Sequence, residues 1–328
     1  MRAQAIPSAP ATALRPLPFT GPWLLAPMEG ITDPVFRDLV LERHRPEDLG
    51  GAFTEFVRVI DRALPEKVLR RHLGPRRFAI PVGVQLMGSD LGALAATARA
   101  AVRAGAPLVD LNFGCPAKGA LKGCAGSALL RDPAALGAVV RATFEAVGEA
   151  VPVTAKIRAG FDDDSLLEDL AASAEANGAA LLTVHCRTRK EGYRDEPDWE
   201  RIARAVAAVA IPVCGNGGVR THADLEGMRR ATGCAYVMVG HGALADPWIF
   251  AGRAVSAAEA ARFLLDYEEG LRTRKQATPR GASSRVKQLL RVWTAGGLVA
   301  DEEDRWTWLH AEEIVARLRH VYSGRYGA

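Results

Sequence analysis

The stretch "PVTAKIRAGFDDDSLLEDLAASAEANGAALLTVHC", residues 152–186, contains the unit from which the fold is built. It begins with a short apolar run rich in β-branched residues, 152–160, and ends with another, 180–186. Both runs are typical of buried strands. Residues 164–179 between them have a helical pattern. A strand, a helix and a second strand in this order predict one βαβ unit of a parallel sheet.

The same alternation recurs along most of the chain. Six further apolar runs are predicted as strands, at residues 23–28, 51–56, 81–87, 108–114, 211–217 and 236–242. Helical patterns lie between most of them, at residues 33–44, 89–106, 132–150, 197–210 and 222–234. Eight strand–helix alternations predict a parallel (β/α)8 TIM barrel. A doubly wound open sheet is the competing α/β fold, but no G-x-G-x-x-G motif follows the first strand.

Strands are no longer predicted beyond about residue 250. Helical patterns occupy residues 257–276, 283–293 and 306–322, which predict a small all-helical C-terminal domain. We therefore divide the chain into a leader at 1–22, a barrel domain at 23–248 and a helical domain at 249–328. The leader, "MRAQAIPSAPATALRPLPFTGP", lacks the apolar block of a signal peptide, and we expect it to be loose and to pack little.

Composition places the chain among soluble globular proteins. Hydrophobic residues make up 48% and charged residues 24% of its 328 residues. No apolar run approaches the roughly 18 residues that span a bilayer. The five cysteines are odd in number, and the spacing of Cys115 and Cys124 fits no common zinc pattern. We expect a cytoplasmic protein in a reducing environment, with no metal and no membrane contact.

The charge of the chain is unevenly distributed, although the net charge is only +4. Residues 270–291 contain no Asp or Glu and seven basic residues: Arg272, Arg274, Lys275, Arg280, Arg285, Lys287 and Arg291. Solvated helix faces usually mix charges of both signs. The stretch is compatible with such a face, but its single sign also favours a polyanionic partner.

Polar side chains follow nearly every predicted strand. In a (β/α)8 barrel these strand ends share one rim, where active sites lie. Single residues have structural alternatives, such as a core position for His185 or a capping role for Gln85, but the set as a whole favours a site. Its members are Met28, Glu29, Glu55, Arg58, Gln85, Asn112, Cys115, Lys156, Arg158, His185, Asn216, Gly240 and Gly242.

Lys156 and two glycine loops indicate the kind of ligand. An ammonium group inside a barrel needs a negative partner, which is either Glu55 or Asp110 in an internal ion pair or an electron-rich ligand. The loops "GNGG" (215–218) and "GHGAL" (240–244) follow the seventh and eighth strands, where barrels bind phosphate. With Gln85 and Lys156 on the same rim, flavin mononucleotide (FMN) fits this pattern.

These motifs resemble those of the tRNA-dihydrouridine synthases. The matching pieces are "LAPMEGITD" (25–33), "TEFVRV" (54–59), "VQLMG" (84–88), "VDLNFGCPAKG" (109–119) with "GSALL" (126–130), "AKIRAGF" (155–161), "LLTVHCRT" (181–188), "CGNGG" (214–218) and "VMVGHGAL" (237–244). They occur in the family's order, and "SSRVKQLL" (283–290) extends the match into the helical tail. "TEFVRV" and "RVKQ" look most like subfamily C, whose members act on uridine 16 of tRNA.

The resemblance implies an oxidoreductase that uses FMN, with NADPH or NADH as the reductant. A hydride would pass from flavin N5 to C6 of uracil, and the catalytic Cys115 would give a proton to C5 from the opposite face. The implied cofactor contacts are Pro27, Met28, Glu29, Gln85, Lys156, His185, Asn216, Gly217, Gly218, Gly240 and His241. The implied tRNA contacts are Arg58, Asn112, Tyr193, Arg285 and Lys287. The target base would be extruded from the RNA into the barrel. No protein partner is implied, and a monomer is expected.

Three positions depart from the family pattern. His241 stands where an arginine is usual, "NGG" replaces "NGE" and so removes a carboxylate at Gly218, and Cys124 replaces a glycine. Cys124 lies nine positions after Cys115, which raises the hypothesis of a disulfide between them under oxidation. Alternative functions are dihydrouridine synthesis at position 20, an FMN barrel oxidoreductase for a free small molecule, as in dihydroorotate-type dehydrogenases, and a cofactor-free RNA-binding barrel.

Overall fold

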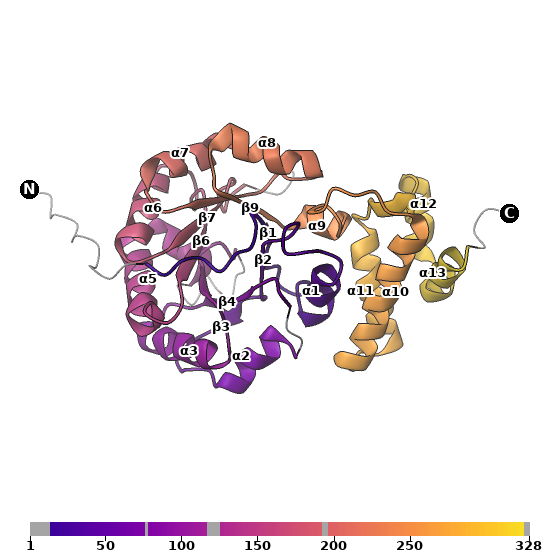
Figure 1. Cartoon of the computed structure of the whole chain (residues 1–328), viewed down its shortest axis with the longest axis horizontal. Coiled ribbons are helices and arrows are strands. Elements are labelled where there is room, and N and C mark those ends of the chain that lie inside the picture. Colours follow the sequence, from indigo (N-terminus) through magenta and orange to yellow (C-terminus); the bar gives the residue numbers. More distant parts are fainter. Residues whose placement is uncertain (1–13, 76–77, 117–124, 192–195, 325–328) are drawn as a thin grey trace, which may run out of the picture.

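Eight parallel strands form a closed barrel in the computed structural model, which describes residues 14–75, 78–116, 125–191 and 196–324 (Figure 1). The ring closes because β1 pairs with both β2 and β9, and β2 pairs with β4. The expected TIM barrel is thereby confirmed. Its strands are β1 (Trp23–Leu25), β2 (Gly51–Phe53), β4 (Val82–Met87), β5 (Val109–Asn112), β6 (Val153–Arg158), β7 (Leu181–His185), β8 (Val213–Asn216) and β9 (Tyr236–Val239).

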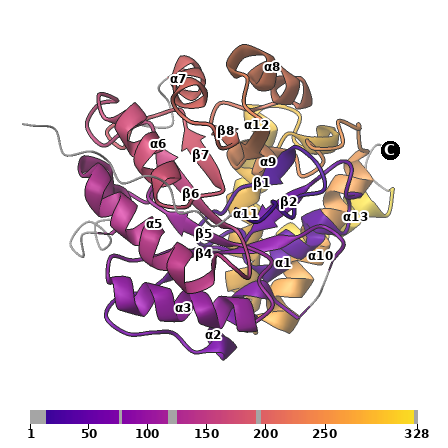
Figure 2. The same cartoon turned by 60° about the vertical axis from the view of Figure 1, so that its left-hand side comes forward.

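Helices surround the strands and bury their apolar faces against them (Figure 2). They are α1 (Pro34–Leu41), α2 (Glu66–Leu73), α3 (Leu91–Arg103), α5 (Pro133–Val147), α6 (Leu167–Ala176), α7 (Glu200–Ala208) and α8 (His222–Thr232). Three of them begin at an aspartate: the side chains of Asp33, Asp90 and Asp132 accept N–H groups in the first turns of α1, α3 and α5. Such caps satisfy backbone donors that would otherwise lack partners.

Four short elements within the barrel domain were not expected from the sequence. They are β3 (Val57–Arg58), the 3-10 helix η1 (Gly126–Arg131), α9 (His241–Ala245) and helix α2. Strand β3 pairs with the end of β4 without joining the ring. Strand β3, η1 and α9 contain too few residues to show a period. Helix α2 is as long as α1, but it has no side-chain cap at its start.

The last part of the leader closes the N-terminal end of the barrel. We expected residues 1–22 to pack little, and this is wrong for the segment around Phe19. The ring of Phe19 contacts Phe53 and Tyr236 edge-on, with ring centroids 6.0 and 5.4 Å apart, and Leu17 packs against the same cluster. Gly51 leaves space for Phe19, because an added Cβ would lie 2.5 Å from its ring. The aromatic side chain thus seals the apolar barrel floor.

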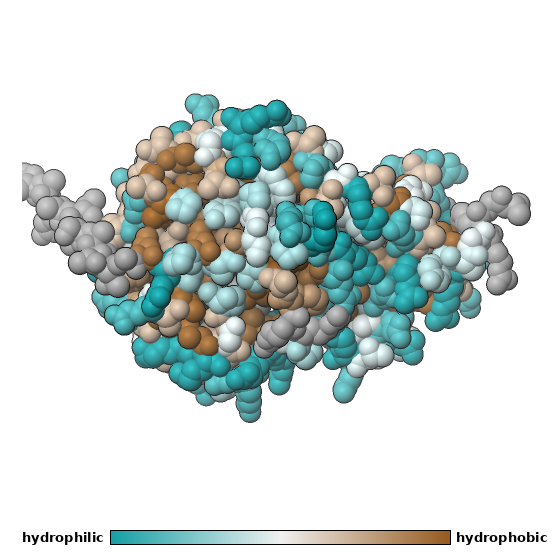
Figure 3. Space-filling view, in the orientation of Figure 1, coloured by the Kyte–Doolittle hydropathy of each residue, from teal (hydrophilic) through white to brown (hydrophobic). Residues whose placement is uncertain are grey.

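The expected C-terminal helical region lies beside the barrel, next to α1 and α9 (Figure 1). Its elements are α10 (Ala257–Arg274), α11 (Pro279–Leu290), η2 (Ala295–Gly297), α12 (Glu302–His310) and α13 (Ile314–Tyr322). The single helix expected at 306–322 is interrupted, because Ala311 has extended backbone angles (φ −58°, ψ 127°). Hydrophilic residues cover most of this region in the view of Figure 3. None of the helices among the described residues is both long and apolar enough to cross a bilayer.

Aromatic residues and ion pairs join the helical region to the barrel. Trp248 contacts Phe263 and Trp293 with ring centroids 5.6 and 6.5 Å apart, and all three are buried. Lys275 and Arg274, at the end of α10, form ion pairs of 2.6 and 2.5 Å with Asp33 and Asp38 of the barrel. Two of the seven basic residues in the 270–291 stretch therefore neutralise buried barrel carboxylates.

Candidate active site

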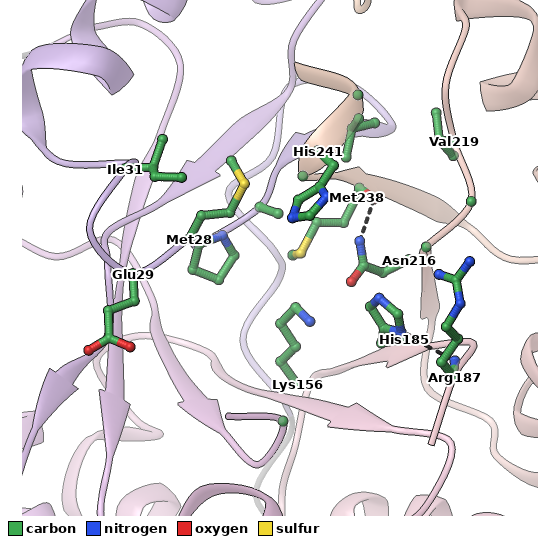
Figure 4. Close-up of a pocket in the computed structure, with 18 of the residues that line it drawn as sticks. Met28, Glu29, Ile31, Lys156, His185, Arg187, Asn216, Val219, Met238 and His241 are labelled. Carbon is green, nitrogen blue, oxygen red and sulfur yellow. Dashed lines mark hydrogen bonds between the residues drawn. The ribbon is translucent and has the colours of Figure 1, made fainter. Parts of the chain in front are cut away.

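A cavity of about 580 Å³ opens at the carboxyl ends of the barrel strands. Its size is within the range of about 300–1,000 Å³ found for small-molecule and cofactor sites. Figure 4 shows Lys156, His185, Asn216 and His241 pointing toward one space, with Met28 on its other side. The predicted residues on the cavity lining are Pro27, Met28, Glu29, Asn112, Cys115, Lys156, Arg158, His185, Asn216, Gly217, Gly218, Gly240, His241 and Gly242.

Lys156 supplies a cation at the centre of the site. Burial, reinforced by the charge of Arg158, lowers the pKa of its ammonium group to about 8. The internal ion pairs considered for it are absent, since no ion pair among the described residues joins Lys156 to Glu55 or Asp110. Asp110 instead hydrogen-bonds Gln85 and Thr154, and Glu55 accepts the backbone N–H of Gly30. The Lys156 ammonium group therefore faces the cavity, whose lining also includes Arg158 and Arg187.

His185 is held as a neutral hydrogen-bond donor. Burial and the nearby Lys156 ammonium group lower the pKa of its imidazole well below the usual range. The backbone N–H of Arg187 lies 3.2 Å from His185 Nδ1 and donates to it. Since Nδ1 accepts, the neutral ring carries its proton on Nε2. Burial also lowers the pKa of His241, with Arg187 adding to the effect, so this second imidazole is neutral as well.

The two glycine loops form a cradle of backbone at the cavity wall. Gly217 and Gly218 have φ of +103° and +83°, which side chains rarely adopt. An added Cβ at Gly217 would lie 2.8 Å from the sulfur of Cys186, and one at Gly218 would lie 2.7 Å from Pro197. The Asn216 amide donates to the carbonyl of Met238 at 2.7 Å and so ties the end of β8, where the first loop begins, to β9. The cradle and the surrounding cations fit a phosphorylated ligand.

Cys115 lies at the cavity edge in the loop after β5 and is 9% exposed. Its backbone N–H donates to Asn112 Oδ1 at 2.9 Å, and its carbonyl accepts the N–H of Ser127 at 3.1 Å. Cys124 lies outside the described residues, so the disulfide hypothesis remains a prediction. The other described cysteines, Cys186, Cys214 and Cys234, are buried free thiols.

Gln85 and three of the predicted tRNA contacts, Arg58, Arg285 and Lys287, do not lie on the cavity lining. Gln85 is fully buried beneath the cavity, and it is not on the lining. Arg58 is exposed on β3. Arg285 donates to the hydroxyl of Tyr267 at 3.1 Å, and Lys287 donates to the carbonyl of Ala311 at 2.8 Å. Tyr193 lies outside the described residues.

The sequence did not predict several lining residues. Arg187 lies within the quoted motif "LLTVHCRT", whose alternation could have indicated it. Val292 and Thr294 belong to the helical region, and no sequence signal places them at a barrel rim. The backbone N–H of Thr294 donates to the carbonyl of Ala245 at 2.9 Å, which fixes this segment against α9. The helical region therefore forms part of the cavity wall.

A parallel (β/α)8 barrel with cations, a glycine cradle and a thiol at its carboxyl rim defines a TIM-barrel enzyme. The family model "Dihydrouridine synthase (Dus)" matches residues 24–280 of the chain. The chain therefore belongs to the dihydrouridine synthase family and is an oxidoreductase.

Curated relatives cover most of the chain. The tRNA-dihydrouridine(16) synthase of Cupriavidus necator is 43% identical over 231 residues, 69% of this chain and 71% of that protein. The tRNA-dihydrouridine(16) synthase of Aquipseudomonas alcaligenes is 38% identical over 287 residues, 82% of this chain and 89% of that protein. The Pseudomonas putida enzyme of the same name is 39% identical over 290 residues, with 82% and 87% coverage.

Proposed function

We propose that this protein reduces uridine 16 of tRNA to 5,6-dihydrouridine, with FMN as cofactor and NADPH as reductant. The observation that carries the proposal is the cavity itself, which combines a cationic floor, a glycine cradle and the Cys115 thiol. The names of the curated relatives support the position of the target uridine. The basic stretch at 270–291 supports a polyanionic substrate.

The residues of the cavity fit FMN. The cradle of Gly217, Gly218 and Gly240, with His241 beside it, would hold the phosphate. Pro27, Met28 and Glu29 would line one side of the ring, and Lys156 would provide a positive charge beside it. Gln85, His185 and Asn216 complete the proposed cofactor contacts. When bound, FMN accepts electrons from NADPH and supplies the hydride that reduces C6 of uracil.

Cys115 would hold the second reagent, a proton at its Sγ atom. A thiol is mostly protonated at neutral pH, so it can act as a general acid toward C5 of the base. The target base must leave the RNA stack to reach the cavity, because the barrel rim cannot enter a base-paired helix. Arg58, Asn112, Tyr193, Arg285 and Lys287 would contact the tRNA around it. A soluble tRNA substrate fits a protein of the cytoplasm.

The substitution Cys115→Ala tests the chemistry. We expect the variant to retain FMN and to oxidise NADPH as the wild type does, but to lose uridine reduction. Cys115→Ala that reduces tRNA at the wild-type rate would exclude the general-acid role. A colourless wild-type protein that cannot be reconstituted with FMN would contradict the cofactor assignment.

Mapping of dihydrouridine in tRNA from a strain lacking the gene tests the position. Loss at position 16 alone is the expected result. Loss at position 20 instead would contradict the position and leave the chemistry standing. Turnover of a free pyrimidine with no change in tRNA would favour a small-molecule oxidoreductase.

A further inference from the structure

A chain of hydrogen bonds runs inside the barrel from the Cys115 loop to a buried carboxylate. The backbone N–H groups of Gly114 and Cys115 donate to Asn112 Oδ1 at 3.0 and 2.9 Å. Asn112 Nδ2 donates to Gln85 Oε1 at 2.7 Å, and Gln85 Nε2 donates to Asp110 Oδ2 at 2.6 Å. The chain thus crosses from strand β5 to β4 and back to β5.

Every hydrogen bond in this series is donated in the direction of Asp110. Its upper end is fixed because backbone N–H groups only donate, so Asn112 must present its oxygen to them. Its lower end is fixed because an ionised carboxylate only accepts, so Gln85 must present its nitrogen to Asp110. Rotation of either amide by half a turn would set donor against donor or acceptor against acceptor. The two amides therefore have one mutually consistent orientation.

We propose that Asp110 is a positioning residue that holds Cys115 in place through Gln85 and Asn112. Asp110 is fully buried and does not reach the cavity, so it cannot act on a substrate directly. Both of its oxygens are engaged, Oδ2 by Gln85 and Oδ1 by the hydroxyl of Thr154 at 2.6 Å. The inference rests on the proposed function insofar as Cys115 is taken as the proton donor.

The carboxylate has a plainer explanation, as a counter-charge for Lys156, but the geometry does not favour it. No ion pair among the described residues joins the two groups, and both carboxylate oxygens face other partners. A neutral side chain could fill the same space without the desolvation cost of a buried charge. Gln85 Nε2 needs a partner that can only accept a hydrogen bond. The ionised carboxylate of Asp110 is such a partner, which gives a reason for the buried charge.

The position of Cys115 depends on the upper end of this chain. Asn112 Oδ1 joins the two N–H groups that begin the loop, and Ser127 holds the Cys115 carbonyl from the other side. Without a fixed Asn112 orientation the hydrogen bonds to these two N–H groups are lost. A displacement of about 1 Å of a reacting group can cost about 100-fold in rate. Loss of Asp110 should therefore slow proton transfer more than it affects the flavin site.

Asp110→Ala and Thr154→Val are the matched variants for a test. Asp110→Ala removes the carboxylate with both of its hydrogen bonds and so breaks the amide chain. Thr154→Val removes only the hydrogen bond to Oδ1 and leaves the amide chain intact. Two rates are measured on the FMN-loaded protein: reduction by NADPH, and single-turnover uridine reduction in tRNA by the prereduced enzyme. The third measurement is the rate of Cys115 alkylation by iodoacetamide, followed on the Cys115 peptide by mass spectrometry. It requires no tRNA and no turnover.

For Asp110→Ala we expect uridine reduction to fall about 10- to 100-fold. Alkylation of Cys115 should become at least about threefold faster, because the loop is less constrained. NADPH oxidation should fall less than uridine reduction, because Gln85 is the one member of the chain among the proposed cofactor contacts, and Thr154→Val should stay within about twofold in all three measurements. Equal effects of the two variants, or unchanged alkylation in Asp110→Ala, would overturn the proposal.

Asp110→Asn provides the test if Asp110→Ala does not fold, because it keeps the side-chain volume. Its amide no longer dictates the orientation of Gln85, so a smaller effect in the same direction is expected. A wild-type enzyme without activity on tRNA would refute the proposed function, whereas the alkylation comparison would still decide the positioning role.

Discussion

Two buried groups of opposite charge occupy adjacent strands inside the barrel. Burial raises the pKa of Asp110 to about 6 and lowers that of Lys156 to about 8. Both groups are therefore mostly charged at pH 7. Each charged side chain costs folding free energy through desolvation, and the attraction between them offsets only part of that cost. The two charges thus make the barrel interior less stable than an apolar one would be. They provide a cation at the cavity, Lys156, and a hydrogen-bond acceptor below it, Asp110.

The pH dependence of FMN binding tests the cationic role of Lys156. Because its pKa is about 8, the ammonium group loses its proton as the pH rises through this value. Affinity for the anionic cofactor should therefore fall between about pH 7 and 9. At pH 7 we expect Lys156→Met to bind FMN about tenfold more weakly. Fluorescence titration of FMN measures both effects.

Lys156→Arg is the control for this prediction, since an arginine keeps its charge over the whole range. It should show no fall in affinity near pH 8. Parallel pH profiles for the wild type and Lys156→Met would show that another group is responsible.

The sequence predicted the lining of the site better than its supporting contacts. Lys156, His185 and Asn216 were identifiable because polar residues at strand ends must lie on one rim. The amide chain beneath them was not, because Gln85 and Asp110 become neighbours only through the register of β4 and β5. A one-residue shift in that register would turn the two side chains to opposite faces.

At the level of elements, local signals determined what could be predicted. The barrel strands carry continuous apolar runs because both of their faces are buried, and helices such as α5 begin at Asp-Pro. The packing of Phe19 was missed because residues 1–22 have the composition of a loose leader. The place of Phe19 on the barrel floor depends on space that Gly51 leaves on strand β2.

Phe19→Ala tests whether this segment belongs to the barrel. Removal of the ring takes away its contacts with Phe53 and Tyr236, and we expect the free energy of unfolding to fall by about 2–3 kcal/mol. Leu14→Ala is the control, because Leu14 is 40% exposed and should change stability by less than about 0.5 kcal/mol. Urea denaturation measures both. Equal stability of the two variants would mean that the aromatic seal contributes nothing.

Considered as a whole, the molecule is proposed to use its basic stretch for two purposes, attachment of the helical region and contact with RNA. Arg274 and Lys275 form ion pairs with Asp38 and Asp33, which are 2% and 1% exposed, and so hold the helical region on the barrel. Arg280 and Arg291 are exposed and remain available to a polyanion. Seven like charges in the sequence therefore overstate the charge that the stretch presents to RNA. The sequence could not show this, because the carboxylates lie more than 200 positions away.

The salt dependence of tRNA binding separates the two purposes. Each arginine that contacts a phosphate adds about 0.7–0.9 to the slope of log Kd against log salt concentration. Arg291 adjoins Val292 on the cavity wall, so Arg291→Gln should lower this slope by about one. Arg274→Gln should leave the slope unchanged and lower Tm instead, because Arg274 is engaged with Asp38. Anisotropy titrations with tRNA at several KCl concentrations, together with thermal melts, measure both quantities. A slope that falls equally in the two variants would show that the ion pair opens when RNA binds, and that the whole stretch faces the substrate.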